Sequence, residues 1–157
     1  MSYAVTCPNN VHEIKDVLFD LWNRNFDRDW CDWYDWMFEG NPYGPVSNWL
    51  VETDRGEVVG STGLMPRDMR IGNRLRRVGQ AIHINVNKEH RTASPALQLQ
   101  RALTNTVREN GMALVCGVTE TAVAVFQRAG YRLLGNVERW IKPLHTEYKL
   151  RNRVRNS

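Results

Sequence analysis

The spacing of apolar residues in the first half of the chain predicts one helix and then a run of strands. A short strand over Tyr3–Cys7 comes first, and the apolar residues after it recur at helical spacing: Val11, Ile14, Leu18, Leu21 and Trp22. Three further strands are predicted, over Trp49–Glu52, Glu57–Met65 and Arg67–Ile71. The dipeptide Gly72-Asn73 predicts a hairpin turn into a return strand, Arg74–Val86. This half of the chain therefore predicts an antiparallel meander.

The second half alternates between strand and helix signals. Ser94 and Pro95 predict the N-cap and the first residue of a helix that ends at Gly111. Its apolar stripe consists of Leu99, Leu103 and Val107. Three shorter elements are predicted after it: a strand over Met112–Gly117, a helix closed by Gly130 and a strand over Tyr131–Ile141.

An acidic segment between the two predicted halves is rich in aromatic residues. It contains Trp30, Trp33, Tyr34, Trp36 and Phe38, and it stops at a turn signal over Gly40–Pro45. These rings are too many for one helical face. We expect most of them in the core, and the others are candidates to line a substrate cleft.

Composition and charge narrow the class of protein. A chain of 157 residues with 42% hydrophobic residues suits one domain, predicted over residues 1–148, with a basic tail over residues 149–157. The net charge is only +4, but Glu13–Glu39 holds eight acidic and three basic residues, whereas Arg67–Glu109 holds nine basic and three acidic residues. The second stretch either attracts anions or forms solvated faces of strands and helices.

The cysteines and histidines argue against a disulfide-stabilised protein and against a metal-binding protein. Three widely spaced cysteines, Cys7, Cys31 and Cys116, form neither a disulfide framework nor a metal motif, and they suit a reducing cytoplasm. The four histidines lack metal-ligand spacing, so no metal site is expected. No apolar run approaches the ~20 residues of a membrane span, and no membrane partner is expected.

The junction between the strand Gln80–Val86 and the helix that follows is the strongest candidate for chemistry. A helix start presents unpaired N–H groups and the positive end of the helix dipole, which together bind phosphate groups. Arg91 adds a positive charge at the same point.

Four segments carry a resemblance to a known family: Trp36–Gly44, Val58–Gly60, Asn85–Leu97 and Val125–Tyr131. With them, the chain from Trp36 to Leu144 resembles the GNAT N-acetyltransferases, especially bacterial members associated with polysaccharide biosynthesis. The resemblance implies an α/β (α+β) fold with a mixed, mostly antiparallel sheet of six to seven strands and about four flanking helices. It also implies an acyl-CoA-dependent N-acyltransferase, most simply an acetyltransferase, that transfers the group directly to a primary amine in a ternary complex.

The same resemblance implies which residues bind acetyl-CoA or another acyl-CoA. The pyrophosphate is expected on the loop and helix start formed by Arg91, Thr92, Ala93, Ser94, Pro95 and Ala96. The pantetheine arm is expected along Ile84, Asn85 and Val86, where the sheet splays open. Ser94 replaces a glycine of the family pattern. Thr119 and Phe126 stand where the family often has an asparagine and a tyrosine that acts as general acid.

His83 is the candidate general base, because histidine titrates near neutral pH and strand alternation is expected to place Ala81, His83 and Asn85 on one face. The alternative is a hydrogen-bonded structural histidine. Gln80 cannot act as a base but could orient a water molecule. Trp36, Glu39 and Asn41 are the expected contacts of a cationic or sugar-like acceptor.

The altered positions leave a second interpretation open: a catalytically altered binding protein, or one that modifies or binds nucleic acid. Its features are Ser94, Thr119, Phe126 and the basic tail. The expected partner is a small-molecule or other amine-bearing acceptor. A homodimer is compatible with the sequence, whereas nucleic acid is compatible but less favoured.

Overall fold

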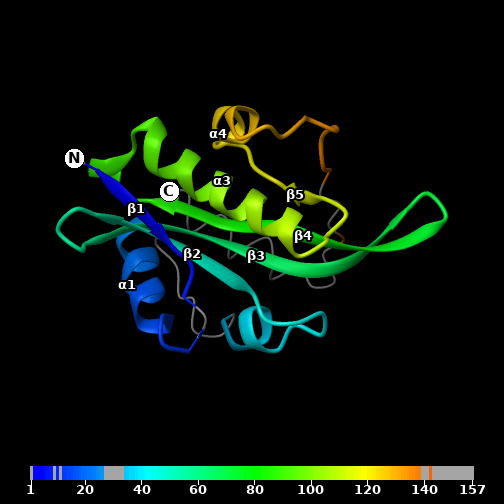
Figure 1. Ribbon diagram of the computed structural model, residues 1–157, viewed down its shortest axis with the longest axis horizontal. Coiled ribbons are helices and arrows are strands. Elements are labelled where there is room, and N and C mark those ends of the chain that lie inside the picture. Colours follow the sequence, from blue (N-terminus) through cyan, green and yellow to red (C-terminus); the bar gives the residue numbers. More distant parts are fainter. Residues whose placement is uncertain (1, 9, 11, 27–33, 139–141, 143–157) are drawn as a thin grey trace.

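The computed structural model describes residues 2–8, 10, 12–26, 34–138 and 142. These residues form one mixed sheet in the order β1-β2-β3-β4-β5 (Figure 1), in which only the β4–β5 pair is parallel. The strands are β1 Tyr3–Thr6, β2 Ser47–Thr53, β3 Val58–Ile71, β4 Arg74–Val86 and β5 Val115–Gly117. The helices are α1 Lys15–Asn25, the π-helical turn η1 Asp35–Glu39, the 3-10 turn η2 Lys88–His90, α3 Ala93–Glu109 and α4 Val123–Arg128.

Each face of the sheet carries its own hydrophobic core. On one face, Leu99, Leu103 and Val107 of α3 and Phe126 of α4 pack on strand residues such as Val59. On the other face, α1 and the η1 segment pack on the sheet through Leu18, Trp22, Tyr34, Phe38 and Leu50. The predicted apolar stripes of α1 and α3 are therefore confirmed for the residues that the structure describes. The predictions for Val11, Trp30, Trp33 and the basic tail lie outside them.

The start of α3 differs from the prediction by two residues. Thr92, not Ser94, is the N-cap residue, with an extended backbone and no side-chain capping bond. Ser94 lies inside the first turn, where its Oγ accepts a hydrogen bond of 2.9 Å from Gln98 Nε2. Pro95 is tolerated there because the first turn of a helix leaves its N–H groups without intrahelical partners.

Strand β3 runs unbroken through Pro66, where the sequence predicted two separate strands. The pairing with β2 ends at Ser47 and Leu64, so Pro66 lies beyond it. The carbonyl of Pro66 accepts a hydrogen bond of 3.0 Å from Asn41 Nδ2. The N and O atoms of one strand residue point to the same edge, so the missing N–H of Pro66 faces an edge where none of the described strands lies. The strand therefore continues through the proline.

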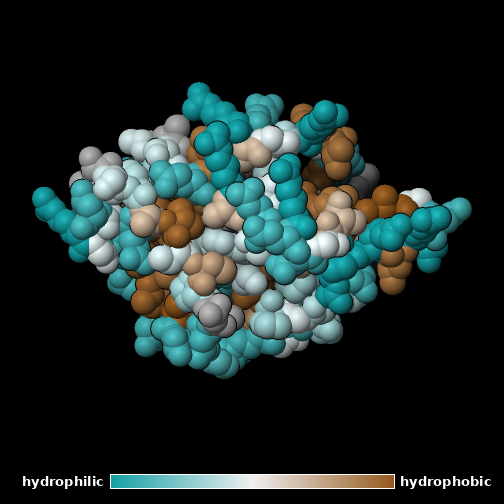
Figure 2. All heavy atoms as spheres, in the orientation of Figure 1, coloured by the Kyte–Doolittle hydropathy of each residue, from teal (hydrophilic) through white to brown (hydrophobic). Residues whose placement is uncertain are grey.

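Beyond that point β3 and β4 continue as a two-stranded ribbon that projects from the body (Figure 1). Arg67–Arg77 carries five arginines and one aspartate, and its tip also exposes Ile71 and Leu75. Figure 2 accordingly shows hydrophilic and hydrophobic surface side by side at this end of the molecule. The predicted hairpin at Gly72-Asn73 is confirmed, and Gly72 has a positive φ of 59° as such turns require.

A β-bulge interrupts β4 at His83. Asn85 pairs with Ser61, but Ile82 pairs with Gly63, so two residues of β4 oppose one residue of β3. His83 has a φ of 50°, in the left-handed region.

The sheet has five strands in the described residues, fewer than the six to seven expected. The missing strand was predicted over Tyr131–Ile141, but Tyr131–Glu138 forms no strand, and residues 139–141 lie outside the described part. Alternating apolar residues form a strand only where a neighbour pairs with the backbone and covers one face. Here Leu133, Leu134 and Val137 are all exposed, Leu134 by 93%.

Candidate active site

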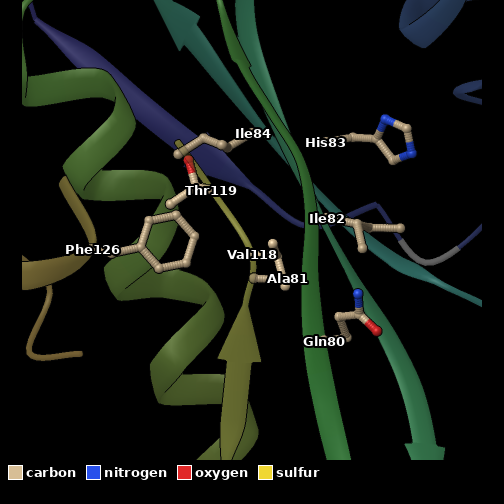
Figure 3. A pocket seen from close by; sticks show the side chains of 8 residues that line it. All are labelled: Gln80, Ala81, Ile82, His83, Ile84, Val118, Thr119 and Phe126. Atoms are coloured by element: carbon tan, nitrogen blue, oxygen red, sulfur yellow. The ribbon is translucent and has the colours of Figure 1, made fainter. Parts of the chain in front are cut away.

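The sheet opens between β4 and β5. The two strands pair only from Gly79 and Val115 to Ala81 and Gly117, and then they diverge. A pocket of about 220 Å³ lies at the point of divergence (Figure 3), lined by Gln80, Ala81, Ile82, His83, Ile84, Val118, Thr119 and Phe126. In the described residues, the edge of β4 beyond Ala81 therefore has no strand partner on this side. Its backbone groups are available to an extended ligand.

The pocket reaches both faces of β4. Figure 3 shows Gln80, Ile82 and His83 on one side of the strand, and Ile84, Thr119 and Phe126 on the other. The bulge causes this arrangement, because Ile82 and His83, although consecutive, lie on the same side. The expectation that Ala81, His83 and Asn85 share a face is thus wrong for Ala81, which packs in the core beneath α3.

His83 lies against aromatic rings. Its imidazole stacks on Trp22, with ring centroids 5.2 Å apart and planes 28° apart, and it lies 5.7 Å from Phe38. The side chain is half-buried, so it contacts both this aromatic cluster and the pocket. A histidine that borders the pocket in this way is a candidate to accept a proton from a bound group.

Thr119 and Phe126 close the opposite side of the pocket. Thr119 Oγ1 accepts a hydrogen bond of 2.9 Å from the N–H of Ala122, so its hydroxyl supports the start of α4. The ring of Phe126 is buried against Tyr131, with centroids 4.7 Å apart. Tyr131 does not replace the missing hydroxyl of Phe126, because its own hydroxyl donates to Gln100 Oε1 at 3.1 Å in the core.

The predicted phosphate-binding residues gather at the start of α3. Thr92 and Ser94 are exposed there, Pro95 is buried and Ala96 packs against the core. Ala93 begins the helix. No side chain caps the helix, so the N–H groups of its first turn remain available to an anion.

Part of the Arg91 guanidinium is used in hydrogen bonds within the protein. Its Nε donates to the carbonyl of Val86 at 3.0 Å, and its Nη2 lies 3.3 Å from Asn25 Oδ1. Asn25 in turn donates to Asn87 Oδ1 at 2.6 Å. Arg91 therefore connects the loop to the end of β4 and to the end of α1, and it leaves only part of its guanidinium for a ligand.

The three residues predicted along the pantetheine path have different surroundings. Ile84 lines the pocket. Asn85 and Val86 are buried and do not line it; the Nδ2 of Asn85 donates to the carbonyl of Leu21 at 3.4 Å. Any contribution of these two residues to a ligand is thus made by their backbone.

The predicted acceptor residues lie in and after η1, and none of them lines the pocket. Trp36 is 63% exposed. Glu39 Oε1 lies 3.0 Å from His12 Nδ1, an ion pair when that histidine is protonated. Asn41 has a structural position, because it holds the turn to Pro66 and accepts a hydrogen bond of 3.2 Å from the N–H of Tyr43.

Sequence reasoning did not select Ala81, Ile82 or Val118, and it assigned Gln80 no firm role, yet all four line the pocket. Their common signal is position, since they lie where two parallel strands part and where ligands bind in many α/β sheets. Cys116, beside Gln80 in the β4–β5 pair, is half-buried. Burial raises the pKa of its thiol, and the charge of Arg67 offsets part of that rise.

The described residues contain neither a candidate metal centre nor a candidate membrane span. No three side chains among histidine, cysteine, aspartate and glutamate lie close enough in this part of the chain to hold a metal ion. Likewise, no helix within it combines the length and apolarity needed to cross a bilayer.

The opened sheet, the adjoining helix start and the pocket together define an α/β acyltransferase architecture. The chain belongs to the family of acetyltransferase (GNAT) domains, which it matches over residues 10–134. No curated protein matches the sequence significantly. The expected association with polysaccharide biosynthesis has no support among these findings.

Solved structures with the same fold are numerous, and three illustrate their range. A predicted acetyltransferase from Clostridium acetobutylicum, solved with acetyl-CoA, is 13% identical, with a TM-score of 0.65 over 90% of this chain and 96% of that one. Glucosamine-6-phosphate N-acetyltransferase from Arabidopsis thaliana is 12% identical, and an aminoglycoside 6'-N-acetyltransferase from Acinetobacter baumannii is 13% identical. Both have TM-scores of 0.66 and cover 92% of this chain and 100% of their own. At these identities the likeness concerns the fold.

Proposed function

We propose that the protein transfers an acetyl group from acetyl-CoA to a primary amine, directly and with both substrates bound at once. The observation that carries the proposal is the pocket at the opening between β4 and β5, which reaches both faces of β4. A donor can thus approach from the α4 side while an acceptor approaches from the His83 side. Such positioning is itself a large source of rate acceleration.

Acetyl-CoA supplies an activated thioester, and the residues here fit its parts. The edge of β4 from Ile82 to Asn85, which pairs with no strand of the described residues, suits the amides of the pantetheine arm, and the uncapped start of α3 suits the pyrophosphate. Ser94 narrows the approach to that helix start relative to glycine, while its side chain is held by Gln98. The fit therefore favours binding through backbone groups, with a limited contribution from Arg91.

His83 is the proposed general base for the amine. It lies on the acceptor side of β4, and its stacking on Trp22 fixes the orientation of the ring. Phe126 has no proton to donate to a departing thiolate. We infer that water or the acceptor itself supplies that proton, and that turnover is slower than with a tyrosine at this position.

The acceptor is proposed to be a small amine rather than a folded protein. The half-buried His83 and the apolar pocket residues Ile82 and Ile84 suit a slender, partly apolar chain. The names of two structural neighbours, an enzyme for glucosamine 6-phosphate and one for aminoglycosides, make amino sugars a natural first panel.

Calorimetry with acetyl-CoA tests the first step. We expect saturable binding that Arg91→Ala weakens and Ser94→Gly strengthens, whereas Arg55→Ala, a matched change in the exposed β2–β3 turn, has no effect. At about 100 times its dissociation constant the ligand should also raise the free energy of unfolding by about 2.7 kcal/mol. No binding to the unmodified protein would exclude the enzyme and leave a binding protein on the same fold.

A further inference from the structure

We propose that the acceptor amine carries an anionic group, a carboxylate or a phosphate, and that Arg67 binds it. This inference deepens the proposed function and rests on it. It starts from a cation at the acceptor end of the pocket that no carboxylate of the described residues neutralises.

Arg67 lies next to the pocket on the acceptor side. The register pairs Met65 with Gln80, so Arg67, two residues along β3, is on the same face as Gln80. Its Nη1 donates a hydrogen bond to Gln80 Oε1, and Gln80 lines the pocket. The charge of Arg67 also reaches Cys116, the partner of Gln80 in β5. Only the side chain of Gln80, to which the guanidinium is hydrogen-bonded, therefore separates Arg67 from the pocket.

No carboxylate in the described part of the chain compensates this positive charge. Within the described residues, Arg77 pairs with Asp68 at 3.2 Å and Arg24 pairs with Asp20 at 2.9 Å, but Arg67 has no acidic partner. Gln80 is neutral and accepts through one oxygen only. Since a guanidinium carries five N–H donors in a planar fork, several remain for a carboxylate or phosphate.

The spacing along β4 sets the shape of the acceptor. Gln80 and His83 are three positions apart along β4, roughly 10 Å at the rise of a strand. One acceptor can therefore place its amine near His83 and its anionic group near Arg67 only if several covalent bonds separate the two groups. This favours an ω-amino acid or an amino sugar phosphate over an α-amino acid.

Matched acceptor pairs test the inference in the presence of saturating acetyl-CoA. Release of the free thiol is measured with 6-aminohexanoate against hexylamine, and with glucosamine 6-phosphate against glucosamine. We expect the anionic member of at least one pair to have a KM about 10-fold lower, and the two pairs distinguish carboxylate from phosphate. Glycine should be a poor acceptor.

Variants then assign the effect to Arg67. Arg67→Ala should raise the KM of the anionic acceptor about 10-fold while its kcat and the KM of the neutral amine stay unchanged; Arg67→Lys should restore part of the difference. Arg70→Ala, an exposed arginine three residues along the same strand, is the control. Circular dichroism and thermal unfolding establish that each variant is folded.

Two results would overturn the inference and tell it apart from the proposed function. If acetyl-CoA binds and neutral amines react as well as anionic ones, or if Arg67→Ala affects both alike, the anion site is wrong and the acyltransferase stands. If calorimetry shows no binding of acetyl-CoA, both are wrong.

Discussion

His83 has a backbone conformation that a strand residue rarely adopts. A φ of 50° in a residue with a side chain is held only where the surrounding structure enforces it, and here the bulge and the stacking on Trp22 do so. Sequence reasoning selected His83 as a candidate general base; the structure places it in the pocket lining, and its catalytic role stays a prediction. Sequence reasoning could not find the bulge, because both faces of β4 are covered here, so Ala81, Ile82 and Ile84 are all apolar and a shift of one residue in the alternation is not visible.

The general base is best tested with His83→Asn, since asparagine tolerates the left-handed conformation and does not titrate. We expect kcat to fall by roughly 10²–10⁴-fold and the acidic limb of the pH–rate profile to disappear, with the Kd for acetyl-CoA unchanged. His83→Ala should lose the same activity but also about 1 kcal/mol of stability, from the positive φ. An unaltered pH profile in the asparagine variant would remove His83 from the mechanism.

Gly117 makes room for the ring that closes the pocket. A Cβ atom there would lie 2.5 Å from Cε1 of Phe126 and 3.0 Å from its Cζ. Because Tyr131 blocks the ring from behind, Gly117→Ala should push Phe126 into the pocket. We expect a loss of about 1–3 kcal/mol in unfolding free energy and a clear rise in the Kd for acetyl-CoA, measured by urea unfolding and calorimetry.

The matched control for this change is Gly79→Ala. Its Cβ would lie 2.3 Å from Cδ1 of Leu64, in the core and away from the pocket lining. It should cost similar stability without changing the affinity for acetyl-CoA. Equal effects of both variants on affinity would mean that Phe126 does not shape the donor site.

At the scale of elements, β1–β5, α1, α3 and α4 were predicted because their signals are local. A stripe at helical spacing or a Gly72-Asn73 turn needs no partner to be recognised. The misplaced features depend on neighbours distant in sequence. The unbroken β3 depends on the point where β2 ends, and the absent strand after Tyr131 depends on what lies beside it.

Gln100 connects α3 to the sheet through side-chain hydrogen bonds that no local sequence pattern reveals. It is fully buried, its Nε2 donates to Thr62 Oγ1 at 3.0 Å, and Tyr131 donates to its Oε1. The Thr62 hydroxyl in turn donates a hydrogen bond of 3.4 Å to the carbonyl of Ile82, a residue that lines the pocket. Its spacing from Leu103 and Val107 places Gln100 on the buried face of the helix, but its polar side chain by itself would suggest a surface position.

Replacing Gln100 with leucine should therefore destabilise the protein, although leucine is similar in size and apolar. The change leaves the half-buried hydroxyl of Tyr131 without this acceptor, at a cost of about 1–3 kcal/mol. Tyr131→Phe should cost about 1 kcal/mol. The double variant should cost less than the sum of the two single variants, because both single changes remove the same hydrogen bond between Tyr131 and Gln100. Additive losses in urea unfolding would show that the two residues act independently.

At the scale of the whole molecule, the basic stretch Arg67–Glu109 does not form one surface. Five of its nine basic residues lie in or at the base of the β3–β4 ribbon, whereas Lys88 and Arg91 lie beside the start of α3. Figure 1 shows the ribbon tip and that helix start at opposite ends of the longest axis. Counting charges along the sequence suggested one anion-attracting region, and the fold divides it in two.

The division predicts that the ribbon does not contact the nucleotide part of acetyl-CoA. Changing Arg70, Arg74 and Arg76 to glutamine lowers the net charge from +4 to +1. At about 0.15 M salt, where charges are screened beyond about 8 Å, we expect the Kd for acetyl-CoA to stay within about 2-fold of the unmodified protein. At about 0.01 M salt the screening length grows to about 30 Å, and a several-fold rise in Kd is expected because the long-range attraction is lost. Arg91→Ala should weaken binding under both conditions, since it acts at short range. Calorimetry at the two salt concentrations separates these cases, and a large loss of affinity in the ribbon variant at the higher salt would place the anionic ligand on the ribbon instead of at the start of α3.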